Sequence, residues 1–165
     1  MKNRLMAVSA ALLVLAATVA AVTASASGTA NAQVNVRTTS LGKILVNGQG
    51  RTLYLFAPDK RGKSVCYGSC ASYWPPLLVA GKPAAGAGVK ASLLGTSVRK
   101  DGKHQVTYNG HPLYTYVGDT AAGKTKGEGL NLSGGLWWVV SPAGKAVKGT
   151  SSSGGGGGYG GGYGG

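Results

Sequence analysis

Two aspartates occupy the same place in a motif that the chain contains twice. Residues 54–59 read Tyr-Leu-Phe-Ala-Pro-Asp and residues 114–119 read Tyr-Thr-Tyr-Val-Gly-Asp. Most glycoside hydrolases use a pair of catalytic carboxylates, one acting as acid and the other as base or nucleophile. Asp59 and Asp119 are therefore the candidates for sugar chemistry. Aspartates in such places also end strands or accept hydrogen bonds from tyrosine hydroxyls, and we favour this structural role.

The motif also places aromatic side chains together. Alternate residues of a strand share a face, so Tyr54 lies beside Phe56 and Tyr114 beside Tyr116. We expect these two aromatic faces to pack across a pseudo-symmetry axis that relates the two copies. A binding site shared by both motifs is the alternative.

Tryptophans form a second candidate surface. Trp74 follows the first motif, and Trp137 with Trp138 follows the second at a similar distance, which suggests equivalent positions. Neighbouring strand residues point to opposite faces, so either Trp137 or Trp138 fills the core and the other is available to a sugar or a partner. The candidate binding residues are thus Tyr54, Phe56, Asp59, Tyr114, Tyr116, Asp119, Trp74, Trp137 and Trp138.

The two cysteines, Cys66 and Cys70, have the spacing C-x3-C. In an oxidising compartment a disulfide between them is expected. The spacing also resembles the copper-binding segment of exported copper chaperones, where thiolates act with a distal histidine, a ligand set that suits copper. The alternative is therefore a copper site of Cys66, Cys70 and His111. Because the thioredoxin-like pattern of those chaperones is missing, we prefer the disulfide and expect no cofactor.

Other enzyme signatures are missing from the chain. There is no G-x-S-x-G elbow, no H-E-x-x-H zinc motif and no glycine-rich phosphate loop that opens a helix. Four acidic residues leave few carboxylates for acid–base catalysis. We therefore expect a protein that is not an enzyme.

The charge is strongly positive, with 17 Lys and Arg against four acids and a net charge of +13. Short basic clusters occur at residues 60–63 and 99–100. Such a charge attracts polyanions. For an exported protein these are anionic cell-wall polymers or polysaccharides and not nucleic acid. Solubility charge spread evenly over the surface is the alternative.

Both ends of the chain differ from the middle. Residues 1–32 read as a cleaved signal peptide, with Lys2 and Arg4 before an apolar stretch and small-residue cleavage sites after it. No cysteine precedes Cys66, so we expect no lipid anchor, and the small-residue cleavage sites with the Ala-rich composition of the apolar stretch argue against a stable transmembrane anchor. Residues 149–165 are rich in Gly and Tyr and are expected to be disordered. The expected location is extracellular and associated with the cell envelope; the oligomeric state stays open.

The middle of the chain reads as strands and turns. We expect a linker at 33–42, a first repeat at 43–80, a loop at 81–92 and a second repeat at 93–148. Hairpin signals surround Asn-Gly and Asp-Gly turns, and no ten-residue window shows helical spacing of apolar residues. The expected fold is all-β, with two pseudo-symmetric repeats of short antiparallel strands in a small sandwich or barrel.

The combination of elements resembles a bacterial family of secreted repeats, predicted lipoproteins with a Y-x-(FWY)-x-x-D motif and no established function. The resemblance rests on both motifs, the cysteine pair, and the segments 74–76, 105–110 and 137–138. It implies a secreted β-rich module with a structural disulfide in the first repeat. Our leading hypothesis is a non-enzymatic binding or structural module of the cell envelope. The alternative is an extracytoplasmic redox or copper-handling protein that uses the C-x3-C pair.

Overall fold

The computed structural model describes residues 32–148. The predicted signal peptide (residues 1–32), apart from its last residue, and the predicted tail (149–165) lie outside the described residues. The described part consists of short strands, one five-residue helix and one 3-10 turn. The expected all-β class is confirmed. None of the helices within residues 32–148 is long and apolar enough to cross a membrane.

The first sheet has the order β2-β1-β4, with β1 (Gln33–Thr39), β2 (Gly42–Asn47) and β4 (Ala84–Ala85). β1 and β2 form an antiparallel hairpin over their whole length. The linker expected at 33–42 is therefore wrong. Val34 and Val36 alternate with polar residues, and the Val34 side chain is fully buried, which is the pattern of a half-buried strand.

The segment expected as a loop at 81–92 carries some regular structure. β4 pairs in parallel with β1, and the 3-10 turn η1 (Ala91–Leu93) leads into the next strand. The glycines and the proline of this segment keep both elements short. The rest of the segment is irregular, as expected.

The second sheet joins the two repeats. β9 (Gly135–Val140) pairs with β3 (Tyr54–Phe56) on one side and with β10 (Ala146–Val147) on the other, and β8 (Asn131–Leu132) also pairs with β9. The hairpin expected between residues 44–46 and 52–56 is correspondingly short. It is limited to a bridge between Val46 and Thr52 and the hydrogen bond from Leu53 N to Leu45 O, because β3 takes its partner from the second repeat.

The third sheet is the expected meander of β5 (Leu94–Val98), β6 (His104–Tyr108) and β7 (His111–Pro112). Its tight turns need left-handed backbone, which Asn109 and Gly110 supply with φ values of 49° and 79°. After Pro112 the chain leaves the sheet. The Tyr114 that follows makes isolated bridges to Tyr54 and to Pro76.

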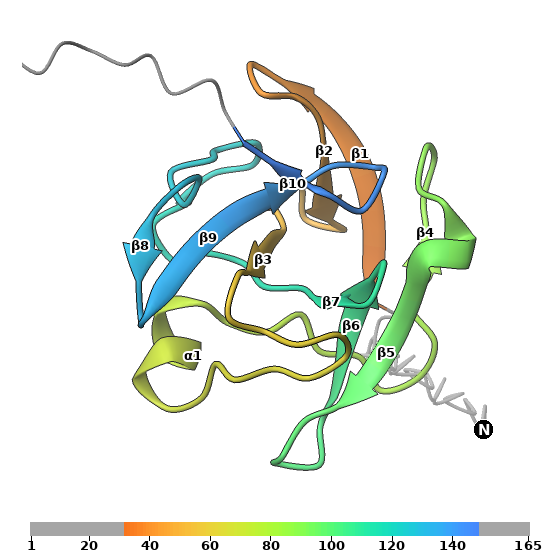
Figure 1. The fold of residues 1–165 in the computed structure, drawn as a ribbon. Coiled ribbons are helices and arrows are strands. Elements are labelled where there is room, and N and C mark those ends of the chain that lie inside the picture. Colours follow the sequence, from red (N-terminus) through yellow and green to blue (C-terminus); the bar gives the residue numbers. More distant parts are fainter. Residues whose placement is uncertain (1–31, 149–165) are drawn as a thin grey trace, which may run out of the picture.

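The sheets enclose two hydrophobic clusters. Tyr54 and Phe56 enter one cluster, and Leu53 and Leu55 enter the other, as the strand alternation predicts. Figure 1 shows β9 running beside β3, with the β5–β6 pair and the short helix α1 (Ser69–Tyr73) toward the lower end of the view. The described strands form three separate sheets, which is compatible with the expected sandwich. The closed barrel that was the other expectation is not formed by the described strands.

Candidate functional site

The two motif tyrosines lie opposite each other where the repeats meet. Tyr54 N donates to Tyr114 O at 2.9 Å, and Tyr114 N donates to Tyr54 O at 3.0 Å. Both side chains are fully buried. This reciprocal pair is the expected pseudo-symmetric contact, and it places the motif inside the protein.

Each motif tyrosine hydroxyl is hydrogen-bonded to the motif aspartate of the other repeat. Tyr54 Oη donates to Asp119 Oδ2, and Tyr114 Oη donates to Asp59 Oδ2, each at 2.6 Å. The second oxygen of each carboxylate accepts a backbone N–H from the loop that follows it, at 2.8 Å in both cases. Each aspartate therefore caps its own loop and receives a proton donor from the other repeat.

Burial shifts the pKa values of these aspartates and tyrosines. It raises the pKa of Asp119 and of Asp59 above the ordinary carboxyl value, although the tyrosine hydrogen bonds act in the opposite direction. Burial, together with the aspartate beside each hydroxyl, also holds the pKa of Tyr54 and of Tyr114 far above its usual range. Asp119 is 1% exposed, so its carboxylate faces the protein interior.

Four aromatic rings form one continuous stack through the core. Phe56 stacks on Trp137 with centroids 4.1 Å apart, Trp137 on Trp74 at 3.9 Å, and Trp74 on Tyr116 at 4.3 Å. The two central rings are parallel within 1°. The stack has the same arrangement at both ends. Phe56 of the first repeat stacks on Trp137 of the second, and Tyr116 of the second repeat stacks on Trp74 of the first.

The tryptophans have the equivalent roles that their spacing suggested. Tyr54 meets Trp74 edge-on at 5.4 Å, and Tyr114 meets Trp137 edge-on at 5.1 Å. Trp137 is the buried member of its pair. Trp138 points to the opposite face of β9, is half-buried, and has the Lys148 ammonium 5.9 Å from its ring centre.

Cys66 and Cys70 are joined in a disulfide, as expected. Cys66 is fully buried, and the loop between the cysteines is held against the core by α1. His111 lies in β7, where burial and the nearby Arg61 lower its pKa. Within residues 32–148 no group of three or more His, Cys, Asp or Glu side chains is arranged to hold a metal ion. A copper site would need reduced cysteines and stays a prediction.

A pocket of about 250 Å³ lies between the disulfide loop and the β5–β6 turn. Its lining consists of basic, hydroxyl and aromatic side chains with one valine: Lys63, Ser64, Tyr67, Val98, Arg99 and Lys100. The fold thus brings Lys63 of the first basic cluster (residues 60–63) beside Arg99 and Lys100 of the second. The sequence analysis noted both clusters but not their meeting, because a tertiary contact between them leaves no local signal.

Arg99 is the unusual member of this pocket, since it is 5% exposed. Its Nη1 donates to Gln105 Oε1 at 2.6 Å and to Ser64 Oγ at 3.0 Å, and its Nη2 donates to Cys66 O at 2.8 Å. Its Nε has no hydrogen-bond acceptor among the described residues and lies 3.7 Å from Asp101 Oδ1. The guanidinium is therefore hydrogen-bonded to neutral acceptors and forms a long ion pair with the exposed Asp101. It is also near enough to Asp59 for its charge to lower the pKa of that carboxyl, against the larger rise that burial causes.

The pocket is linked to the repeat motif. Ser64 Oγ lies 2.8 Å from Tyr114 Oη, which is bonded to Asp59. Tyr67, inside the disulfide loop, has its ring 4.4 Å from the Arg99 guanidinium carbon. The Tyr114–Asp59 pair, which joins the two motif copies, and the wall of the pocket thus form one hydrogen-bonded unit.

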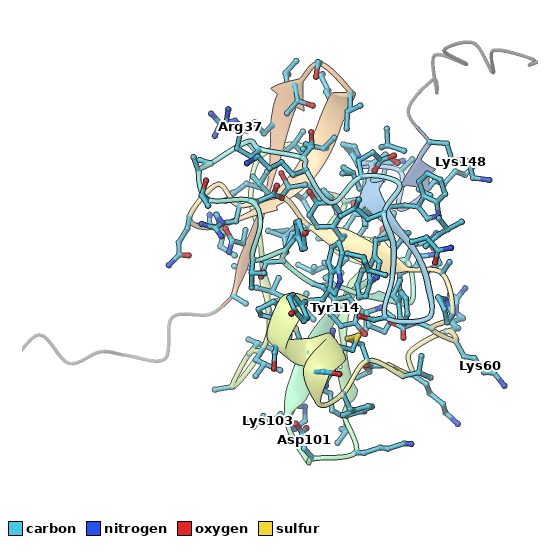
Figure 2. The ribbon with its side chains drawn as sticks, turned by 90° about the vertical axis from the view of Figure 1, so that its left-hand side faces the viewer. Arg37, Lys60, Asp101, Lys103, Tyr114 and Lys148 are labelled. Carbon is cyan, nitrogen blue, oxygen red and sulfur yellow. A yellow bond between two sulfur atoms is a disulfide. The ribbon has the colours of Figure 1, made fainter. Side chains whose placement is uncertain are left out.

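Basic side chains dominate the described surface. The exposed ones are Arg37, Lys43, Lys60, Arg61, Lys63, Lys82, Lys90, Lys100, Lys103, Lys124, Lys126, Lys145 and Lys148. Asp101 is the exposed acid of the described residues, whereas the other acids are buried or half-buried. In Figure 2 the labelled Arg37, Lys60, Lys103 and Lys148 lie around the outline of the molecule, and Tyr114 lies at its middle.

Residues 35–78 and 95–141 each match a family described as a secreted repeat of unknown function. The two matches coincide with the two halves related by the motif. Comparisons with curated proteins and with solved structures gave no match.

Proposed function

This chain belongs to that family of secreted repeats, and on this premise we propose that it is a non-enzymatic module that binds anionic polymers of the cell envelope. The observation that carries the proposal is the imbalance of exposed charge within residues 32–148. Thirteen basic residues are exposed among the described residues, and Asp101 is the acid exposed beside them. An exported surface of this kind draws in teichoic-acid-type polymers or acidic polysaccharides and holds them by many weak contacts.

The placement of the acids supports the non-enzymatic part of the proposal. Asp59 and Asp119 accept hydrogen bonds from tyrosines and from backbone amides, and Glu128 accepts one from Val139 N. Carboxylates used in this way stabilise the fold. A sugar-cleaving role would require at least one of them to face a substrate.

Retention on purified cell walls tests the proposal. The secreted protein is loaded on walls at low salt and eluted with increasing sodium chloride, beside walls stripped of anionic polymer. Exposed charges are screened beyond about 10 Å at 0.1 M salt, so elution is expected at a few tenths molar salt, with little retention on stripped walls. Retention that ignores both salt and stripping contradicts the proposal.

A matched pair of variants separates charge from specific contacts. Replacing Lys43, Lys82 and Lys145 by glutamine lowers the net charge by three at sites outside the basic pocket. Elution of this variant is expected at lower salt. Replacing the same residues by arginine keeps the charge and serves as the control, which should elute with the unaltered protein.

A further inference from the structure

We propose that the pocket between the disulfide loop and the β5–β6 turn, whose lining includes Lys63, Ser64, Arg99 and Lys100, binds one phosphate-type oxyanion, such as a phosphodiester group of the polymer. The inference deepens the proposed function and rests on it for the identity of the polymer. It adds a defined site to a surface that otherwise attracts anions by its overall charge.

The buried guanidinium is the first observation. Removing a cation from water is costly unless it is paired and hydrogen-bonded, yet the direct acceptors of Arg99 are two side chains and a carbonyl, all of them neutral. Its Nε is itself buried, lacks a hydrogen-bond acceptor among the described residues and lies 3.7 Å from Asp101 Oδ1, while Arg99 as a residue lines the pocket. Three of its five N–H groups are used by these neutral acceptors, so Arg99 contributes to the pocket mainly a positive charge that an entering phosphate can pair with.

The rim of the pocket supplies further positive charge. Lys63 and Lys100 are exposed and line the pocket from opposite chain segments, 60–63 and 99–100. Asp101, the nearby carboxylate, is 42% exposed and contacts Arg99 Nε at 3.7 Å without a hydrogen bond. An entering oxyanion can therefore take the place of this loose neighbour while both lysines approach it.

The walls of the pocket are fixed before any ligand enters. Tyr67 is held in the loop that the disulfide closes, and its Oη accepts a hydrogen bond from Lys100 N at 3.0 Å. Ser64 is held by Tyr114 and by Arg99. Because Arg99, Ser64 and Tyr67 are already ordered, the conformational entropy of binding is lost mainly by the two rim lysines.

Titration with inorganic phosphate, followed by amide NMR at constant ionic strength, tests the inference. We expect saturable shifts confined to the amides of the pocket, at residues 63–67 and 98–100. Sodium chloride at the same ionic strength should not reproduce them. Shifts that do not saturate, that spread evenly over the basic surface, or that chloride reproduces overturn the inference.

Two double variants of equal charge make the assignment specific. Lys63→Gln with Lys100→Gln removes the rim and is expected to weaken phosphate binding about tenfold or more, the effect of roughly 1.4 kcal/mol. Lys43→Gln with Lys145→Gln removes the same charge outside the pocket and should change the affinity little. Equal weakening in both variants overturns the inference. The exposed lysines are altered and not Arg99, because replacing a buried arginine could disturb the core. Near-UV circular dichroism checks that both variants keep the native core.

The two proposals fail in different ways. If phosphate does not bind in the pocket while retention on walls remains salt-dependent, the surface acts by charge alone and the pocket is a structural feature. If phosphate binds in the pocket but the protein is not retained on walls, the site stands and the proposed polymer is wrong.

Discussion

Tyr54 and Asp119 lie 65 residues apart in the sequence and are joined by a hydrogen bond of 2.6 Å in the core. The contact is repeated in reverse by Tyr114 and Asp59 at the same distance. Each repeat thus contributes the hydroxyl of one pair and the carboxylate of the other. The motif therefore joins the two repeats, and the contribution of its hydrogen bonds to the free energy of unfolding can be measured.

Replacing Tyr54 by Phe leaves the buried Asp119 carboxylate without its hydroxyl donor. We expect the free energy of unfolding in urea to fall by about 1–3 kcal/mol. Tyr114→Phe should lower the free energy of unfolding by less, because the Asp59 carboxylate that loses its donor is half-buried and water can replace the hydroxyl. Tyr73→Phe, at an exposed tyrosine, is the control and should stay within about 0.5 kcal/mol. Equal stabilities for the Tyr54 variant and the control would show that the pair contributes nothing.

The stability of the protein should rise as the pH falls from 7 toward 4. Burial raises the pKa of Asp59 and Asp119 in the folded state, so the folded protein binds these protons more tightly than the unfolded chain. Their contribution is complete below the ordinary carboxyl pKa of 3.8 and is lost as the pH rises through the folded value. Urea denaturation at several pH values measures this, and Asp119→Asn should flatten the profile.

His111 acts against this trend and has to be controlled. Its pKa is lowered in the folded state, so its contribution is present above the ordinary value of 6.5 and is lost as the pH falls. The pH series is therefore made in a His111→Gln background. A stability that still decreases toward pH 4 there contradicts raised carboxyl pKa values.

The aromatic stack predicts a large difference between neighbouring tryptophans. Trp137→Ala removes a fully buried ring that stacks on two others and meets Tyr114 edge-on, with an expected cost of about 3–5 kcal/mol. Trp138→Ala removes a half-buried ring on the other face and should cost clearly less. Near-UV circular dichroism should lose the signal of the stacked pair when either Trp74 or Trp137 is changed to Phe, and should keep it in the Trp138 variant.

The disulfide closes a short loop, with a sequence separation of 4 between Cys66 and Cys70. For a loop of this length the entropic model gives a stabilisation of about 2 kcal/mol. The double variant Cys66→Ala, Cys70→Ala should therefore remain folded with a lower unfolding free energy. Thermal denaturation of the oxidised and the variant proteins measures the difference. A variant as stable as the oxidised protein would show that the bond does not constrain the unfolded chain.

The sequence was informative where a pattern is local. Alternation predicted the two faces of β3, and Asn-Gly and Asp-Gly predicted the turns of the β5–β7 meander. It was misread at residues 33–39, where Val34 and Val36 between polar residues already have the period of a strand.

Long-range partners could not be predicted in the same way. No local pattern predicts that Tyr54 bonds to Asp119 and not to Asp59, because both aspartates hold the same position in their copies of the motif. The hydrogen bonds of the buried Arg99 also include Ser64 Oγ and the Cys66 carbonyl, which are 35 and 33 residues away and reach Arg99 only in the folded chain. The candidate pocket is therefore a property of the fold and not of any one motif.

The exchange of contacts between Tyr54–Asp119 and Tyr114–Asp59 has the form of an isologous interface, in which residue i meets j and j meets i. Within one chain, this is the geometry of a two-fold homodimer whose subunits have been joined. A half-length polypeptide with one motif would hold one donor and one acceptor that its own fold leaves unmatched. Such a fragment can complete both contacts only by associating with a second half.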